Sequence, residues 1–254
     1  MAVLPGAEPF TSDGGAVGVV LCHGFTGTPQ SLRPWAEALA AAGHTVRLPL
    51  LPGHGTTWQD MNRSTWRQWY GAVDEAFREV SQRCETVVVA GLSMGGALAL
   101  RLAEEHGDAV SGLVLVNPCV RLEDPRLRAL PVLRRVTSSV APIASDIRKA
   151  GSVELAYART PLHALHESLA LYRHVVADLH RVDQPLLLFR SVVDHVVPAS
   201  SSALVLASVS SGDAVEVLCE NSYHVATLDH DAELIVAGSL DFISRLSEPA
   251  EATR

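Results

Sequence analysis

The sequence has few of the residues that define several large protein classes. Of its 254 residues only 5% are aromatic, four are cysteine, and lysine occurs once, as Lys149. The cysteines are scattered with no C-x-x-C pair, which is typical of reduced thiols rather than of a disulfide framework or a zinc ribbon. No apolar run approaches the roughly 20 residues that a membrane-spanning helix needs. We therefore expect neither a disulfide scaffold nor an integral membrane protein.

Charge and composition exclude further classes. Acidic residues outnumber basic ones by 28 to 20, a net charge of −8, so the phosphate-neutralising surface of a nucleic-acid binder is not expected. Residues 1–10 lack the basic flank and apolar core of a secretory signal, which predicts a cytoplasmic location. Hydrophobic residues make up 48% of the chain, enough to bury one sizeable core and to exclude wholesale disorder. No spacing typical of metal ligands occurs, and no metal or organic cofactor is expected.

Short apolar segments alternate with amphipathic ones along most of the chain. The pattern predicts strands at 16–22, 44–48, 86–90, 112–116, 186–190 and 214–218, and helices at 30–42, 65–82, 94–106, 200–210 and 231–246. Strands that are apolar throughout and alternate with helices are typical of a parallel sheet covered on both faces. The predicted fold class is therefore α/β, with a mostly parallel central sheet flanked by helices.

One long segment interrupts this alternation. Between Asn117 and Gln184 no strand signal occurs, whereas five prolines and several short helical runs do. Ordinary connections have a median of about 4–6 residues, so a segment of this length predicts a helical insertion that rests on the sheet. We expect the insertion at about residues 119–183, within a single domain that spans residues 1–254.

The strongest local motif is G-x-S-x-G at Gly91, Ser93 and Gly95. A buried strand is predicted just before it and a helix just after it, the placement that a nucleophile elbow requires. In such a turn the serine is strained, and its neighbours two residues away must be small so that strand and helix can pass closely. We interpret Ser93 as a catalytic nucleophile. The alternative is a glycine-rich turn with an incidental serine.

A serine hydroxyl needs a base, and in the order typical of this elbow an acid and then a histidine follow the serine. His224 lies in a loop between the last predicted strand and the last helix, whereas His230 is close to the helix start and suits a surface or capping role. Asp194 follows the preceding strand, whereas Asp183 precedes it and would lie at the opposite end of the sheet. We predict Asp194 and His224 as acid and base, with a structural Asp194 that caps a turn as the alternative.

Acyl transfer also needs hydrogen-bond donors aimed at the developing oxyanion. The N–H after the nucleophile, on Met94, is one predicted donor. The second is expected from the loop after the first strong strand, where Gly24 allows close approach and leaves the Phe25 N–H as donor. His23, which precedes the serine in the chain, is interpreted as a residue that organises this loop rather than as a base.

Five segments in this order resemble the α/β-hydrolase superfamily, and within it the group of bacterial monoacylglycerol lipases and small carboxylesterases. They are His23-Gly24-Phe25-Thr26-Gly27, Pro52-Gly53-His54-Gly55, Gly91-Leu92-Ser93-Met94-Gly95-Gly96, Asp194-His195-Val196-Val197-Pro198, and residues 221–229 around His224. The resemblance covers about residues 17–245. It implies a triad of Ser93, Asp194 and His224, oxyanion donors on Phe25 and Met94, and a small helical cap inserted after the sixth strand.

The same resemblance extends into the insertion, at residues 145–149 and 153–157. In those lipases a cap glutamate in the matching place contacts the glycerol hydroxyls, which points to Glu154; a glutamate on a helix surface is the plain alternative. The activity implied is that of a serine hydrolase that converts monoacylglycerol to fatty acid and glycerol through an acyl-enzyme. A broad carboxylesterase, a thioesterase, an acyltransferase and a non-catalytic ligand-binding module remain as alternatives.

The expected partner is a small acyl ester, and the oligomeric state is left open. Arginines interleave with apolar residues early in the insertion, at Arg121, Arg126, Arg128, Arg134 and Arg135 among Leu122, Leu127, Leu130, Val132 and Leu133. Such a stretch is compatible with weak peripheral contact to an anionic lipid surface. Such a stretch is more often a helix that packs one face on the enzyme and exposes its arginines to water.

Overall fold

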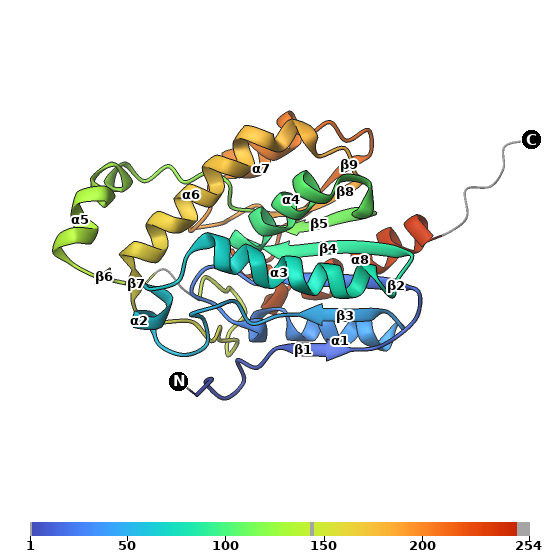
Figure 1. Ribbon diagram of the computed structural model, residues 1–254, viewed down its shortest axis with the longest axis horizontal. Coiled ribbons are helices and arrows are strands. Elements are labelled where there is room, and N and C mark those ends of the chain that lie inside the picture. Colours follow the sequence, from blue (N-terminus) through green and yellow to red (C-terminus); the bar gives the residue numbers. More distant parts are fainter. Residues whose placement is uncertain (1, 143–144, 248–254) are drawn as a thin grey trace, which may run out of the picture.

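The computed structural model describes residues 2–142 and 145–247, which are built around one seven-stranded sheet (Figure 1). The strand order is β1-β3-β2-β4-β5-β8-β9. The strands are β1 (Phe10–Ser12), β2 (Val17–Cys22), β3 (Thr45–Leu48), β4 (Thr86–Leu92), β5 (Gly112–Val116), β8 (Leu186–Ser191) and β9 (Ala214–Cys219). Every neighbouring pair is parallel except β1 with β3 at one edge. The predicted mostly parallel sheet is confirmed.

The central strands are apolar throughout because both of their faces are covered. Successive side chains point to opposite faces, so Val19 and Leu21 enter one core cluster while Val20 and Cys22 enter the other. The same alternation holds along β4, β5 and β8. A strand buried on both sides has no polar face, which is why its sequence reads as a continuous apolar run.

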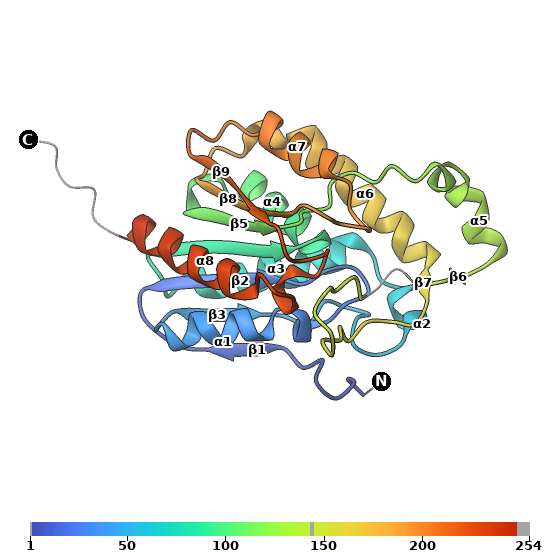
Figure 2. The ribbon, with the colours of Figure 1, turned by 180° about the vertical axis from the view of Figure 1, so that it is seen from behind.

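Helices form a layer on each face of the sheet. They are α1 (Arg33–Ala41), α2 (Trp58–Met61), α3 (Trp66–Ser81), α4 (Met94–His106), α5 (Leu130–Val136), α6 (Leu162–Asp178), α7 (Ala199–Ser208) and α8 (Ala232–Ser247). One face is covered by α3, α4, α6 and α7, and the other by α1 and α8, which lie in front in Figure 2. A capping box of Thr65 and Gln68 sets the start of α3. The flanking helices are thus confirmed.

The segment between β5 and β8 differs in detail from the expectation. It contains two short strands, β6 (Ser139–Val140) and β7 (Thr160–Pro161), which pair antiparallel and were not predicted because two residues show no alternation. It also contains one long helix, α6, in addition to short helical runs at Pro125–Ala129, Leu130–Val136 and Leu179–Arg181. The buried residues Leu171 and Val175 join α6 to the same core cluster as α4, whereas α5 stands away from the sheet (Figure 1).

The insertion follows β5, the fifth strand of the chain, and the expectation that it follows the sixth is wrong. Within residues 2–16 the structure has one strand, β1. Two prolines, Pro5 and Pro9, lie in the remainder of this stretch, and proline has no N–H to donate to a strand ladder. The three-residue β1 was itself not predicted, because three residues are too few to reveal a period.

All four cysteines lie within the described residues, where each is buried and carries a free thiol. Cys22 and Cys119 lie in the core cluster on the α3–α4 face, where cysteine acts as a small hydrophobic residue. The interpretation of these residues as reduced thiols agrees with this packing.

In residues 2–142 and 145–247, no helix combines the length and the apolar character that crossing a bilayer would require.

Candidate functional site

Ser93 lies at the sharp turn between β4 and α4. Its φ of 57° and ψ of −120° are strained values for a residue other than glycine. A Cβ on Gly91 would lie 2.2 Å from the Gly95 carbonyl oxygen, and a Cβ on Gly95 would lie 1.8 Å from the Cys22 carbonyl oxygen. Both positions therefore require glycine, which explains the G-x-S-x-G spacing in this chain.

His224 and Asp194 come from neighbouring strand ends and form a hydrogen-bonded pair. His224 Nδ1 lies 2.7 Å from Asp194 Oδ2, and both side chains are 8% exposed. The second carboxylate oxygen, Oδ1, accepts hydrogen bonds of 2.8 Å from the N–H groups of Val196 and Val197. Both oxygens of this buried carboxylate are thus used, and the carboxylate fixes the proton of the His224 ring on Nδ1.

The pair perturbs the pKa of both of its members. Burial disfavours the charged imidazole, but the hydrogen bond to Asp194 and its charge outweigh burial and raise the pKa of His224 above its ordinary value. Burial by itself would raise the pKa of Asp194. The hydrogen bonds from His224, Val197 and Val196 stabilise the ionised carboxylate more strongly than burial destabilises it, so the pKa of Asp194 is lowered. At neutral pH the arrangement therefore holds an ionised acid beside an imidazole of increased basicity.

The loop after β2 lies directly over the serine. A Cβ on Gly24 would lie 3.5 Å from the Ser93 Cβ, so this loop approaches Ser93 closely, as expected from the sequence. In the described part of the chain, neither the Phe25 N–H nor the Met94 N–H donates to a protein acceptor. These are the two groups predicted as oxyanion donors.

His23 organises this loop as interpreted from the sequence. The side chain is completely buried; Nε2 accepts the Leu51 N–H at 3.1 Å, so Nδ1 carries the proton and donates to the Gly24 carbonyl at 3.0 Å. Burial lowers the pKa of His23 to about 4, only partly opposed by its bond to Gly24. His23 is therefore a neutral residue that holds the peptide group between Gly24 and Phe25.

A cavity of about 50 Å³ brings four of the six predicted site residues together. Its walls are formed by Gly24, Phe25, Leu92, Ser93, Ser145, Asp146, Glu154, Val196, His224 and Val225. Of the other two predicted residues, Asp194 is hydrogen-bonded to His224, and Met94 follows Ser93 in the chain.

Glu154, on the wall of this cavity, is half-buried, and its carboxylate accepts the Ser145 N–H at 3.2 Å. Burial raises the pKa of Glu154 above its ordinary value.

Two carboxylates tie residues 145–149 of the insertion to the loop that carries His224. Asp146 accepts the backbone N–H groups of His224, at 3.2 Å, and of His195, at 3.0 Å. The buried Asp229 accepts the N–H groups of Arg148, at 2.6 Å, and Lys149, at 2.8 Å. Sequence reasoning did not single out these contacts, because nothing in a local pattern reports partners that lie 49 to 81 residues apart.

The rejected alternatives lie away from the cavity. His230 is exposed, and its N–H donates to Asp229 at the approach to α8. Asp183 is exposed and precedes β8, at the opposite end of this strand from Asp194. Of the candidates compared from the sequence, the structure groups only Asp194 and His224 with Ser93. Among the described residues no three His, Cys, Asp or Glu side chains gather closely enough to hold a metal ion.

Known proteins resemble this chain in both sequence and fold. A family model described as serine aminopeptidase, S33, matches residues 16–231. A thermostable monoacylglycerol lipase from Bacillus sp. (strain H-257) is 44% identical over 244 residues, which are 96% of each chain. A carboxylesterase from Bacillus subtilis (strain 168) is 23% identical over 94% of this chain and 97% of its own length.

Solved structures agree with these matches. The structure reported for the metagenome-derived lipolytic enzymes LipS and LipT superposes with a TM-score of 0.94, at 42% identity, over 96% of this chain and 100% of its own. The monoacylglycerol lipase of Paleococcus ferrophilus superposes with a TM-score of 0.76 at 19% identity, over 94% of this chain and 100% of its own, a likeness of fold.

Proposed function

This chain belongs to the α/β-hydrolase family described as serine aminopeptidase, S33, and on that premise we propose that it hydrolyses monoacylglycerols to fatty acid and glycerol through an acyl-enzyme on Ser93. The observation that carries the proposal is the bonded pair of His224 and Asp194 at the wall of the cavity onto which Ser93 opens. The 44% identity to a monoacylglycerol lipase supports the choice of ester.

In the proposed reaction Ser93 attacks the ester carbonyl while His224 takes the hydroxyl proton. The protonated His224 then gives that proton to the glycerol oxygen as the carbon–oxygen bond breaks, and Asp194 stabilises the imidazolium in between. Water repeats the sequence on the acyl-enzyme and releases the fatty acid. The N–H groups of Phe25 and Met94 would stabilise the oxyanion of both tetrahedral intermediates, since the low-dielectric site strengthens such bonds.

The two ends of the proposed substrate find different surroundings. The polar side of the cavity, with Glu154 and Ser145, suits glycerol hydroxyls. A cavity of about 50 Å³ is far below the 300–1,000 Å³ of typical ligand pockets, so an acyl chain must extend beyond it. Phe25 lines the cavity and packs against the same apolar cluster as Leu169. Leu169 in turn lines an open groove of about 730 Å³ between residues 120–128 and α6. We propose this direction for the acyl chain.

The proposed function is tested with a substrate panel. Monoacylglycerols of varied chain length are compared with triacylglycerols, methyl esters and thioesters, and the enzyme is separately treated with a fluorophosphonate probe. We expect labelling of Ser93 and the highest kcat/KM on monoacylglycerols. Preferred transfer of the acyl group to glycerol or a thiol instead of water would make the protein an acyltransferase, and absence of labelling would indicate a ligand-binding module.

Glu154→Ala is expected to affect glycerides selectively. A hydrogen bond to a charged group is worth about 1.5–3 kcal/mol, so losing the contact should raise KM for a monoacylglycerol by roughly 10–100-fold. The methyl ester of the same fatty acid has no glycerol hydroxyls and should keep its KM within about twofold. Initial rates on the two esters measure the difference. An equal loss on both esters would contradict a glycerol contact.

We further propose that the chain is a single domain, residues 1–254, in which residues 119–183 act as a cap over the site. Residues 143–144 of the cap, and residues 1 and 248–254 of the domain, lie outside the described residues. Helix α5 presents three exposed apolar side chains, Val132 at 67%, Leu133 at 39% and Val136 at 81%. Arginines flank them on the same helix and before it, at Arg128, Arg134 and Arg135. An apolar ridge with a basic rim suits weak contact with an anionic lipid surface.

Replacing both Val132 and Val136 with glutamate is expected to weaken binding to phosphatidylglycerol vesicles by at least about tenfold. Burying a valine side chain contributes about 1.5 kcal/mol, and the new charges are repelled by the anionic surface. Vesicle co-sedimentation measures the effect. Val215→Glu serves as a matched control, because Val215 is a valine of β9, 43% exposed and outside the cap. Equal vesicle binding by the α5 variant and wild type would contradict the contact.

A further inference from the structure

Asn117 follows β5 and reaches both loops that carry the proposed acid and base. It is 2% exposed and has a φ of 43°, in the left-handed region that asparagine tolerates better than most residues. Its Oδ1 accepts the Ser191 N–H at 2.7 Å, and its Nδ2 donates to Ser191 Oγ at 2.9 Å and to the His224 carbonyl at 2.8 Å. Both amide protons and the amide oxygen therefore have partners.

Ser191, at the end of β8, extends the same network. Its hydroxyl accepts from Asn117 and donates to the Tyr223 carbonyl at 2.8 Å. Two successive carbonyls of the base loop, those of Tyr223 and His224, are thus held from the ends of β8 and β5. The acid, Asp194, lies three residues after Ser191 on the same loop. One buried network consequently sets the acid loop and the base loop relative to each other.

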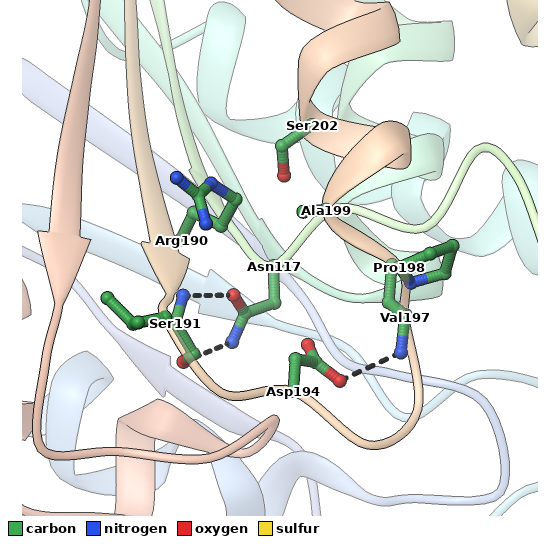
Figure 3. Close-up of a pocket in the computed structure, with 9 residues that line it drawn as sticks. Asn117, Arg190, Ser191, Asp194, Val197, Pro198, Ala199 and Ser202 are labelled. Carbon is green, nitrogen blue, oxygen red and sulfur yellow. Dashed lines mark hydrogen bonds between the residues drawn. The ribbon is translucent and has the colours of Figure 1, made fainter.

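The network borders a second cavity, of about 190 Å³. Asn117, Ser191 and Asp194 line it together with Val197 and the start of α7 (Figure 3). Figure 3 shows Asn117 and Ser191 joined by two hydrogen bonds beside the Asp194 carboxylate. Because space for water lies next to Asn117, removing its side chain would let water solvate the freed His224 carbonyl without holding it in place.

We propose that Asn117 is a positioning residue for the catalytic base, acting through Ser191 and through the His224 main chain. The role rests on the proposed function, since it presumes that His224 transfers protons. A base displaced by about 1 Å costs on the order of 100-fold in rate, even where substrate binding is unchanged. The network therefore matters for kcat rather than for KM.

The inference is tested with Asn117→Gly, which accepts the positive φ while removing all three hydrogen bonds, and with Ser191→Ala as a milder second variant. Active sites are counted by fluorophosphonate labelling, so that kcat refers to folded enzyme. We expect kcat per active site to fall by roughly 10–100-fold in Asn117→Gly and less in Ser191→Ala, with KM within about twofold. The downfield proton resonance of the His224–Asp194 hydrogen bond should broaden or vanish in Asn117→Gly.

Ser201→Ala is the matched control. Ser201 is fully buried, and its hydroxyl bonds the Pro118 carbonyl and the Val120 N–H, close to Asn117 in the chain. The alanine substitution removes only these hydroxyl bonds and leaves the bond from the Ser201 N–H to Pro198, at the end of the acid loop, in place. This variant should lose thermal stability while keeping kcat and the downfield resonance. If Asn117→Gly also lost only thermal stability and kept kcat and the downfield resonance, the positioning role would be overturned. Wild-type protein that neither labels nor turns over esters would instead overturn the proposed function on which this role rests.

Discussion

Ser93→Ala is expected to lower kcat for ester hydrolysis by roughly 10⁴–10⁶-fold, the largest effect of any single substitution in this chain. Alanine removes the attacking oxygen, and the remaining catalysis comes from the oxyanion donors and substrate binding. The serine is 8% exposed and lines the small cavity, so the smaller methyl side chain of alanine should fit without loss of folding. Burst kinetics with a chromogenic ester measure both acylation and turnover.

A second serine separates chemistry from packing in this experiment. Ser239 is fully buried in α8, where its hydroxyl bonds the Ile235 carbonyl at 2.6 Å, on the far face of the sheet from α4. Ser239→Ala should retain the burst and full turnover. Substantial turnover by Ser93→Ala, with a burst amplitude equal to that of wild type, would show that another group is the nucleophile.

Asp194→Asn is expected to lower kcat by about 10⁴-fold. The introduced amide can present a donor to His224 Nδ1, which forces the ring proton onto Nε2, the nitrogen that must accept the Ser93 proton. Folding should survive, because the oxygen of the introduced amide can still accept the Val196 and Val197 N–H groups that Asp194 holds. Asp183→Asn, at the exposed start of β8, is the control and should leave kcat unchanged. A loss in the control variant instead would reassign the acid.

The pH profile of the same pair has a defined sign. In the proposed mechanism only neutral His224 can take the Ser93 proton, so kcat/KM should fall as the pH drops through the pKa of His224. Because Asp194 raises that pKa, the acid limb of the wild-type profile should lie above the ordinary value of about 6.5. In the residual activity of Asp194→Asn the carboxylate charge is gone, the pKa falls, and the limb should move to lower pH.

Local pattern was sufficient for much of the fold. The predicted helix at 94–106 and strand at 112–116 have the bounds that the structure gives to α4 and β5. The helix is long enough to show its hydrophobic period and ends before Gly107, and the strand is a continuous apolar run that ends before Asn117. The very short elements β1, α2 and β6, of two to four residues, were missed because they are too short to show a period.

The candidate site divides in the same way. Ser93, Asp194 and His224 could be selected from strand ends and chain order, because parallel strands bring their carboxyl ends to one edge of a sheet. Asn117 could not, since its partners Ser191 and His224 lie 74 and 107 residues away. Asp146, which binds the His224 main chain from the insertion, was missed for the same reason.

The sequence by itself determined the parallel sheet, the turn that holds Ser93 and the order of the residues that follow it, because strand period, glycine sterics and chain order are local properties. Only the tertiary structure decided how many strands precede the insertion, how residues 145–149 attach to the base loop, and which buried groups bond the His224 main chain. These features consist of hydrogen bonds between distant segments, and such bonds exist only once packing has excluded water and brought donor and acceptor together.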